Sequence, residues 1–175
     1  MSTSALYDRA ALPLVPLASR LPFVAGGGGG LPDRDVVAED VRVDHGRLAA
    51  YARVCGFPLG RTLPLTYPGV LTFPLQLGLM ASGDFPFAAV GLVHVANRVQ
   101  QHRAIGTEEP LSLRVRAQDL RPHPKGRLFT VRSEVRAGGE LVWASDSEYL
   151  RRGGGDPGAP RDAAAAPVAR HDVVW

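Results

Sequence analysis

The sequence predicts a single α+β domain in which one long apolar helix lies against a curved antiparallel sheet. Three observations lead to this prediction. Residues 69–82 are apolar almost all round, as in a helix that is buried on most sides. Residues 111–120 alternate between apolar and polar side chains, which is typical of a strand with one buried face. Gly138 and Gly139 then mark a tight hairpin between two further strand-like runs.

The segment ahead of the long helix predicts a strand, a short helix and a loop. Residues 36–43 alternate loosely, as a strand does. Asp44 is a suitable N-cap for a helix that runs through Arg53, and Gly56 is a suitable stop. The apolar stripe of this helix consists of Leu48, Ala49, Ala52 and Val54. Residues 57–68 are rich in proline and glycine and predict a loop.

The second half of the chain predicts four antiparallel strands. They are expected at residues 89–103, 111–120, 128–135 and 141–150, with a turn at residues 122–126. The predicted order of elements favours an α+β domain: one strand, a short helix, a long helix and then four strands. Pro74 is compatible with the long helix only in its first turns.

Glycine-rich stretches mark both ends of the predicted domain. Five glycines run from Gly26 to Gly30, but no Lys-Ser/Thr follows them, so they predict a linker rather than a phosphate loop. The C-terminal stretch is rich in Gly, Ala and Pro and predicts a second linker or tail. We therefore expect an N-terminal segment and linker over residues 1–30, the folded domain over 31–152 and the tail over 153–175.

Charge and cysteine content exclude several classes of protein. The 20 basic and 17 acidic residues nearly balance, and they are spread as on a solvated face rather than clustered for nucleic acid. The one cysteine, Cys55, excludes an intramolecular disulfide and favours a reducing compartment. Prolines and Arg20 interrupt the apolar residues 11–25, so neither a leader peptide nor a span of about 20 residues is predicted. We expect a cytoplasmic protein without nucleic-acid or membrane partners.

Three segments of the chain resemble the MaoC-like acyl dehydratases and (R)-specific enoyl hydratases. They read LAAYARVCG over residues 48–56, LPLTYPGVLTFPL over 63–75 and FPFAAVGLVHVANR over 85–98. The resemblance covers about residues 31–152 and is closest to the N-terminal, non-catalytic half of double-hotdog members. It implies the hotdog fold, in which an antiparallel sheet wraps a long central helix. It also implies pairing of sheets into a dimer, and chemistry on 2-enoyl or 3-hydroxyacyl thioesters of coenzyme A or acyl carrier protein. No metal or other cofactor is implied.

The catalytic motif of that family is missing from this chain. The family uses a carboxylate and an imidazole in Asp-x-Asn-Pro-x-His, which share the activation of water and the proton transfer. The motif should follow the helix that ends at Gly56, where this chain reads FPLGRTLP, with no Asp, Asn or His before Asp84. We therefore predict no catalytic residue in this chain.

Five residues are candidates for binding the substrate: Tyr67, Gly69, Val70, Phe73 and His94. In the family, amides at the start of the central helix polarise the thioester carbonyl. Gly69 would let the thioester approach them, with simple loop geometry as the alternative. Tyr67 would donate a hydrogen bond nearby or pack as a turn aromatic, and Val70 and Phe73 belong to the apolar helix. His94 is a structural histidine, or it lines the acyl tunnel or an interface.

The spacing on the strand after the long helix predicts which side chains share a face. His94 and Arg98 should lie on one face, continued by His102, with Asn97 on the other. Two further carboxylate–imidazole spacings, Asp40 with His45 and Asp119 with His123, are interpreted as coincidence. Neither carries the Asn-Pro of the family motif.

These observations lead to three functional hypotheses. The first is a substrate-binding or structural half that works beside a catalytic hotdog. That catalytic hotdog would follow the abrupt Val-Val-Trp end of this sequence or belong to a partner subunit, and the protein would form a homodimer or a heterodimer. The second is an active hydratase that uses other residues, His94 or His102 among them. The third is a module that binds acyl thioesters without chemistry.

Overall fold

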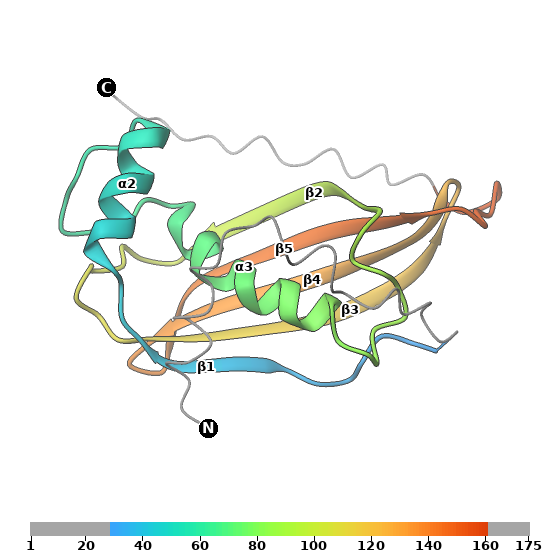
Figure 1. Ribbon diagram of the computed structural model, residues 1–175, viewed down its shortest axis with the longest axis horizontal. Coiled ribbons are helices and arrows are strands. Elements are labelled where there is room, and N and C mark those ends of the chain that lie inside the picture. The colour runs from blue at the N-terminus through green and yellow to red at the C-terminus, as the bar shows by residue number, and fades with distance from the viewer. Residues whose placement is uncertain (1–28, 161–175) are drawn as a thin grey trace.

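The computed structural model describes residues 29–160 as two helices and one five-stranded antiparallel sheet. The elements are β1 (Val36–Val41), α2 (His45–Cys55), α3 (Tyr67–Met80), β2 (Leu92–Gln101), β3 (Leu111–His123), β4 (Gly126–Ala137) and β5 (Glu140–Arg152). The strands lie in the order β1-β3-β4-β5-β2, and α3 crosses one face of the sheet while α2 lies at one end (Figure 1). The predicted α+β architecture is confirmed. Within residues 29–160, neither helix has the length and hydrophobicity to span a bilayer.

Local signals set the ends of α2 as the sequence predicts. The Asp44 carboxylate accepts a hydrogen bond from the Arg47 N–H at 2.9 Å, and Gly56 ends the helix in the left-handed conformation, with φ 73°. Only a residue without a Cβ adopts that conformation without strain. The helix buries Leu48 and Ala52 against the core.

The prediction that the long helix is buried on most sides is wrong. Helix α3 starts at Tyr67, with Pro68 in its first turn, and packs on β3, β4 and β1. Its opposite stripe is open: Val70 is 46%, Phe73 48% and Leu77 40% exposed. The sheet covers one side of the helix, and nothing else among the described residues covers the other.

Two apolar clusters fill the space between α3 and the sheet. One gathers around Trp143, whose indole N–H donates to the Leu65 carbonyl at 2.9 Å, and includes Leu71 and Ile105. The other gathers around Phe129, which packs against the rings of Phe85 and Phe87 at centroid distances of 5.4 and 5.6 Å. Each such fully buried side chain contributes about 1.5–3 kcal/mol to folding.

A bulge in β2 overturns the predicted distribution of its side chains. Pairing with β5 shifts between His94 and Ala96, so that Val95 is an extra residue. His94 then lies opposite Tyr149 and Asn97 opposite Ser147, which places both on the α3 side. Arg98 lies opposite Asp146 on the far face. The prediction that His94 and Arg98 share a face is therefore wrong, because one inserted residue reverses the alternation.

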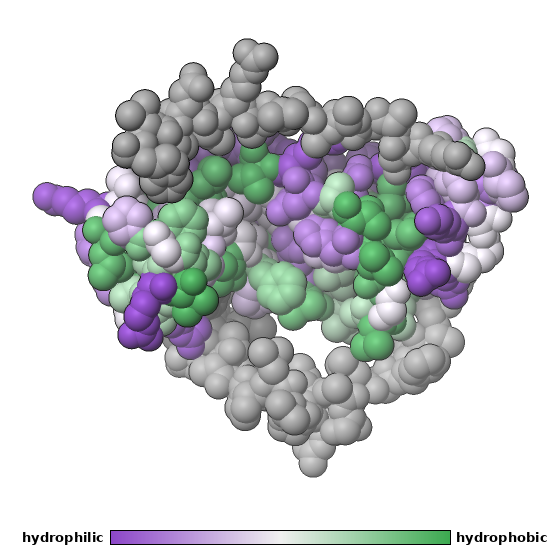
Figure 2. All heavy atoms as spheres, turned by 90° about the horizontal axis from the view of Figure 1, so that it is seen from above, coloured by the Kyte–Doolittle hydropathy of each residue, from purple (hydrophilic) through white to green (hydrophobic). Residues whose placement is uncertain are grey.

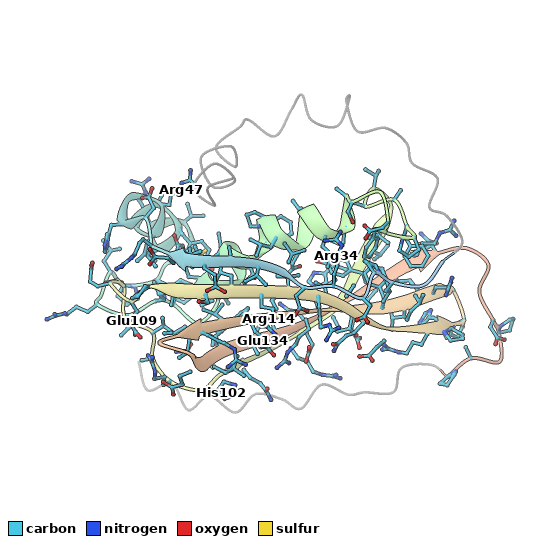
Figure 3. The ribbon with its side chains drawn as sticks, turned by 90° about the horizontal axis from the view of Figure 1, so that it is seen from below. Arg34, Arg47, His102, Glu109, Arg114 and Glu134 are labelled. Carbon is cyan, nitrogen blue, oxygen red and sulfur yellow. The ribbon has the colours of Figure 1, made fainter. Side chains whose placement is uncertain are left out.

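The sheet face turned away from α3 carries charged side chains in ion pairs. Arg132 pairs with Asp146 at 3.0 Å and Arg121 with Glu148 at 2.9 Å. Arg114, Glu134 and His102 also lie on this side (Figure 3). This face is the solvated surface that the dispersed charges predict.

Candidate substrate-binding groove

A groove of about 340 Å³ lies between α3, β2 and β5. This volume falls in the range of about 300–1,000 Å³ that is usual for small-molecule sites. The helix supplies one wall, with Gly69, Val70, Phe73 and Gln76, next to Thr66. The two strands supply the other wall, with His94, Asn97, Ser145, Ser147 and Tyr149. Viewed from above, the molecule shows separate hydrophobic patches beside hydrophilic surface (Figure 2).

The structure brings four of the five predicted binding residues together. Gly69, Val70, Phe73 and His94 all line the groove. Tyr67 does not line it, since its side chain is buried in the core with its ring edge against Tyr51 at a centroid distance of 5.2 Å. Its hydroxyl is buried, and this burial raises the pKa of Tyr67.

The amides at the start of α3 already have partners. The N–H of Tyr67 donates to the Pro64 carbonyl at 2.9 Å, and that of Gly69 donates to the Thr66 carbonyl at 3.2 Å. Pro68 between them has no N–H. A thioester carbonyl at this point would have to replace the long Gly69 bond. A Cβ on Gly69 would meet the Trp143 ring at 3.7 Å, which is an ordinary contact, so steric exclusion alone does not require glycine here.

A buried hydrogen-bonded network forms one end of the groove. The side-chain amide of Gln76 donates to the Ser133 hydroxyl at 2.9 Å, and its oxygen accepts from the Tyr149 hydroxyl at 3.1 Å. Burial raises the pKa of Tyr149, so its phenol stays protonated at neutral pH. Sequence reasoning missed Gln76, although a single amide within an otherwise apolar helix is a visible signal.

The strand wall is polar because of the β2 bulge. The Ser147 hydroxyl donates to the Asn97 side-chain oxygen at 3.3 Å. The imidazole of His94 stacks on the ring of Tyr149 at a centroid distance of 4.9 Å. Ser145 is almost completely buried beneath the groove. Asn97, Ser145 and Ser147 were not predicted, since an uninterrupted alternation points Asn97 to the far face.

No carboxylate lies among the described residues that line the groove. The other predicted spacings do not assemble a dyad. The Asp40 carboxylate is 3.4 Å from the Arg42 guanidinium, and the His45 imidazole is 3.0 Å from the Glu108 carboxylate. The His123 ring nitrogen accepts from the Lys125 N–H at 3.1 Å, at the β3–β4 turn.

The groove therefore combines one imidazole and one phenol with neutral amides and hydroxyls. In the part of the chain that the structure describes, no three His, Cys, Asp or Glu side chains gather as metal ligands would. The arrangement suits binding of a neutral ligand through hydrogen bonds. A long helix that lies on one face of a five-stranded antiparallel sheet is the architecture of the hotdog fold.

Comparison with known proteins relates this domain to the acyl-thioester dehydratases. The chain is 37% identical over 142 residues to 3-hydroxyacyl-thioester dehydratase X of Mycobacterium tuberculosis, which covers 81% of this chain and 47% of that protein. The crystal structure of HtdX from the same organism matches with 39% identity and a TM-score of 0.64, covering 68% of this chain and 51% of that chain. The HadBC dehydratase complex of M. tuberculosis shares the fold, with a TM-score of 0.56, 16% identity and coverage of 70% of this chain and 98% of that chain. No protein-family model matches.

The resemblance to the MaoC-like acyl dehydratases is confirmed, and so is the hotdog fold. This chain is a hotdog protein related to the 3-hydroxyacyl-thioester dehydratases. It spans about half the length of the curated relative that it matches.

Proposed function

We propose that this chain is the substrate-binding half of an acyl-thioester dehydratase or hydratase and works beside a second hotdog that carries the Asp and the His. The observation that supports this proposal is a groove at the central helix whose described lining contains an imidazole but no carboxylate. The ligand would be an acyl thioester of coenzyme A or acyl carrier protein, with no metal or other cofactor.

The chemistry explains why one imidazole is insufficient. Dehydration of a 3-hydroxyacyl thioester removes a proton from C2 and releases the C3 hydroxyl as water. A base must take the first proton while an acid protonates the leaving oxygen. His94 is the one imidazole among the described residues of the groove, and burial raises the pKa of the Tyr149 phenol. The reaction needs both a base and an acid, and we propose that a catalytic partner supplies the residue that this groove lacks.

An uncovered apolar surface supports a hotdog partner. The exposed stripe of α3, formed by Val70, Phe73 and Leu77, lies on the groove side, and β2 is an edge strand. An exposed apolar stripe next to unpaired strand backbone is a common association surface. The HadBC and ChsH1–ChsH2 structures of M. tuberculosis, which share the fold, are complexes of two different proteins. We propose the same mode here, with a catalytic hotdog as the partner.

Two further predictions belong to this proposal. Residues 31–152 form the hotdog domain, between an N-terminal segment with its linker (1–30) and a tail (153–175). The cytoplasmic location inferred from the single Cys55 stays a prediction.

Hydration of crotonyl-coenzyme A tests the proposal. The chain alone should show no turnover above buffer, and turnover should appear when it is co-purified with a hotdog protein that carries Asp-x-Asn-Pro-x-His. The same partner without this chain should be slower, especially on long acyl groups. Robust turnover by the chain alone would contradict the proposal.

An active enzyme with His94 as its proton-transfer group is the second candidate. The bulge favours it, since it places His94 in the groove on the ring of Tyr149. If the lone chain turns over, His94→Ala should reduce kcat at least 100-fold, because general acid–base catalysis contributes about 10²–10⁴-fold. His102→Ala, on the far sheet face, is the matched control and should keep full activity.

A further inference from the structure

A second hollow lies on helix α2, on the face that does not carry the buried Leu48 and Ala52. This α2 hollow has a volume of about 450 Å³, and its lining comes from the helix and the loop that follows it: Gly46, Ala49, Ala50, Arg53, Phe57 and Leu59. Leu59 is 69% exposed, and Val54, the last residue but one of the helix, is 83% exposed. Large apolar side chains gathered at an exposed hollow are typical of a surface that contacts another molecule.

The charged side chains with no partner at the α2 hollow are basic. Arg53 lines the hollow, and Arg61 follows its lining by two residues. Neither guanidinium forms an ion pair within the part of the chain that the structure describes. No Asp or Glu occurs in the sequence from residue 45 to residue 83. The carboxylates at the start of α2 already have partners: Asp44 is 3.8 Å from Arg47, and Glu108 is 3.0 Å from His45.

The α2 hollow adjoins the groove at the start of α3. Phe57, in the lining of the hollow, stacks on the ring of Tyr51 at a centroid distance of 6.1 Å. The Tyr51 hydroxyl is in turn 2.6 Å from the hydroxyl of Thr66, which lines the groove. One side chain, Tyr51, therefore connects the two sites, at the end of the sheet where α2 lies (Figure 1). A molecule seated on the α2 hollow would stand at one end of the groove.

We propose that the α2 hollow docks a protein carrier of the acyl group, through carboxylates of that carrier that surround an apolar side chain. This inference rests on the proposed function, in which the groove holds a thioester of coenzyme A or acyl carrier protein, and it selects acyl carrier protein. The apolar side chain of the carrier would pack between Phe57 and Leu59. Its carboxylates would pair with Arg53 and Arg61.

A protein carrier accounts for this surface better than coenzyme A does. Phosphate groups bind where several arginines or backbone N–H groups converge. Arg53 is the one charged residue in the described lining of the α2 hollow. Coenzyme A would also leave Val54 and Leu59 in water, whereas a protein surface covers such side chains and excludes water around the ion pairs.

Calorimetric titration of the full chain with three probes tests the docking. The probes are decanoyl acyl carrier protein, the same carrier protein without the acyl group, and decanoyl-coenzyme A. Decanoyl acyl carrier protein should bind at least about tenfold more tightly than decanoyl-coenzyme A, because it contacts the hollow as well as the groove. Its affinity should fall when the salt concentration is raised from about 0.05 to about 0.5 M, since ion pairs at an exposed surface are screened.

Substitutions at the α2 hollow separate docking from binding in the groove. Arg53→Glu should weaken the binding of decanoyl acyl carrier protein at least about tenfold and leave the affinity for decanoyl-coenzyme A unchanged. Leu59→Ser should give a smaller loss of the same kind. Both side chains are exposed, so both variants should fold. Lys125→Glu changes the net charge equally at the exposed β3–β4 turn, at the other end of the sheet, and should bind all three probes as the unmodified chain does (Figure 1).

The outcomes distinguish this inference from the proposed function. Tighter binding of decanoyl-coenzyme A than of decanoyl acyl carrier protein would overturn the inference and leave the proposed function standing. An equal loss of affinity for both thioesters in Arg53→Glu would do the same. A dimer in light scattering that dissociates in Leu59→Ser would assign the hollow to a second copy and also overturn the inference. Failure to bind either decanoyl thioester would overturn the proposed function as well.

Discussion

The two halves of the sheet present different chemistry to the helix side. Under α3, strands β3 and β4 turn apolar side chains inward: Leu113, Val115, Phe129, Val131 and Val135. At the other half, β5 and β2 turn mainly polar side chains inward: His94, Asn97, Ser145, Ser147 and Tyr149. The covered half, together with Trp143 of β5, supplies the buried apolar area that drives folding. The open half supplies hydrogen-bonding groups that a ligand or partner can use.

Truncation of a side chain should lower the free energy of unfolding far more in the covered half than in the open half, and Phe129 should show the largest effect. The ring is fully buried on β4 between Phe85, Phe87 and Tyr149. Phe129→Ala should lower the free energy of unfolding by about 3–5 kcal/mol, measured by urea denaturation. Val93→Ala, on the exposed edge strand, is the control and should change it by about 0.5 kcal/mol or less. Similar losses in both variants would contradict the assignment of stability to the covered half.

Gln76 joins the two halves, and its replacement should have the next largest effect. Its amide bonds Ser133 on β4 and Tyr149 on β5. Gln76→Leu keeps the volume but leaves two buried hydroxyls without partners, so unfolding should cost about 1–3 kcal/mol less.

A double-mutant cycle with Tyr149→Phe checks that the bond itself is responsible. Tyr149→Phe should lower the free energy of unfolding less in the Gln76→Leu variant than in the unmodified chain, because the phenol of the variant has already lost its acceptor. Strictly additive losses would show that Gln76 acts through packing.

Introducing a charged side chain on the open stripe of α3 should weaken association with a partner while changing the stability of the fold only slightly. Phe73 is half exposed, so Phe73→Glu should lower the free energy of unfolding by only about 1 kcal/mol. The same change should abolish pairing with a hotdog partner, seen as a shift to the monomer mass in light scattering. Arg53→Glu, on α2 away from the groove, is the control. A large loss of stability in Phe73→Glu would place this stripe within the monomer's own core.

The smallest expected effect concerns the loop that links the open strand β2 to the covered strand β3. Arg103 donates to Glu109 at 2.8 Å, and with the Gly106 N–H it holds the pKa of the Glu109 carboxyl below its usual range. A folded-state pKa below the unfolded value means that this stabilisation is complete above about pH 4.5 and is lost as the pH falls through the folded-state pKa. Glu109→Gln should therefore destabilise the chain more at pH 7 than at pH 3. An equal difference at both pH values would contradict the role of the charge.

Local signals made much of the fold predictable. The Asp44 cap and the Gly56 stop act within one turn of helix, so α2 starts as predicted and ends two residues beyond the predicted Arg53. Alternation within each strand predicted β3, β4 and β5 in order, although each extends by a few residues. The missing Asp-x-Asn-Pro-x-His is also readable directly, because the motif is contiguous in the chain.

The arrangement of side chains in the groove could not be predicted from any single segment, because it depends on how distant segments pair and pack. The extra Val95 is a bulge only relative to β5, so the sequence of β2 alone could not place His94 and Asn97 on one face. Likewise, the apolar character of α3 does not say which stripe the sheet covers and which it leaves open. The sequence alone therefore determined the elements, their order and the absent dyad, all of which depend on residues close together in the chain. Only the tertiary structure decided the polar wall and the open stripe, because both result from strand pairing and packing between distant segments.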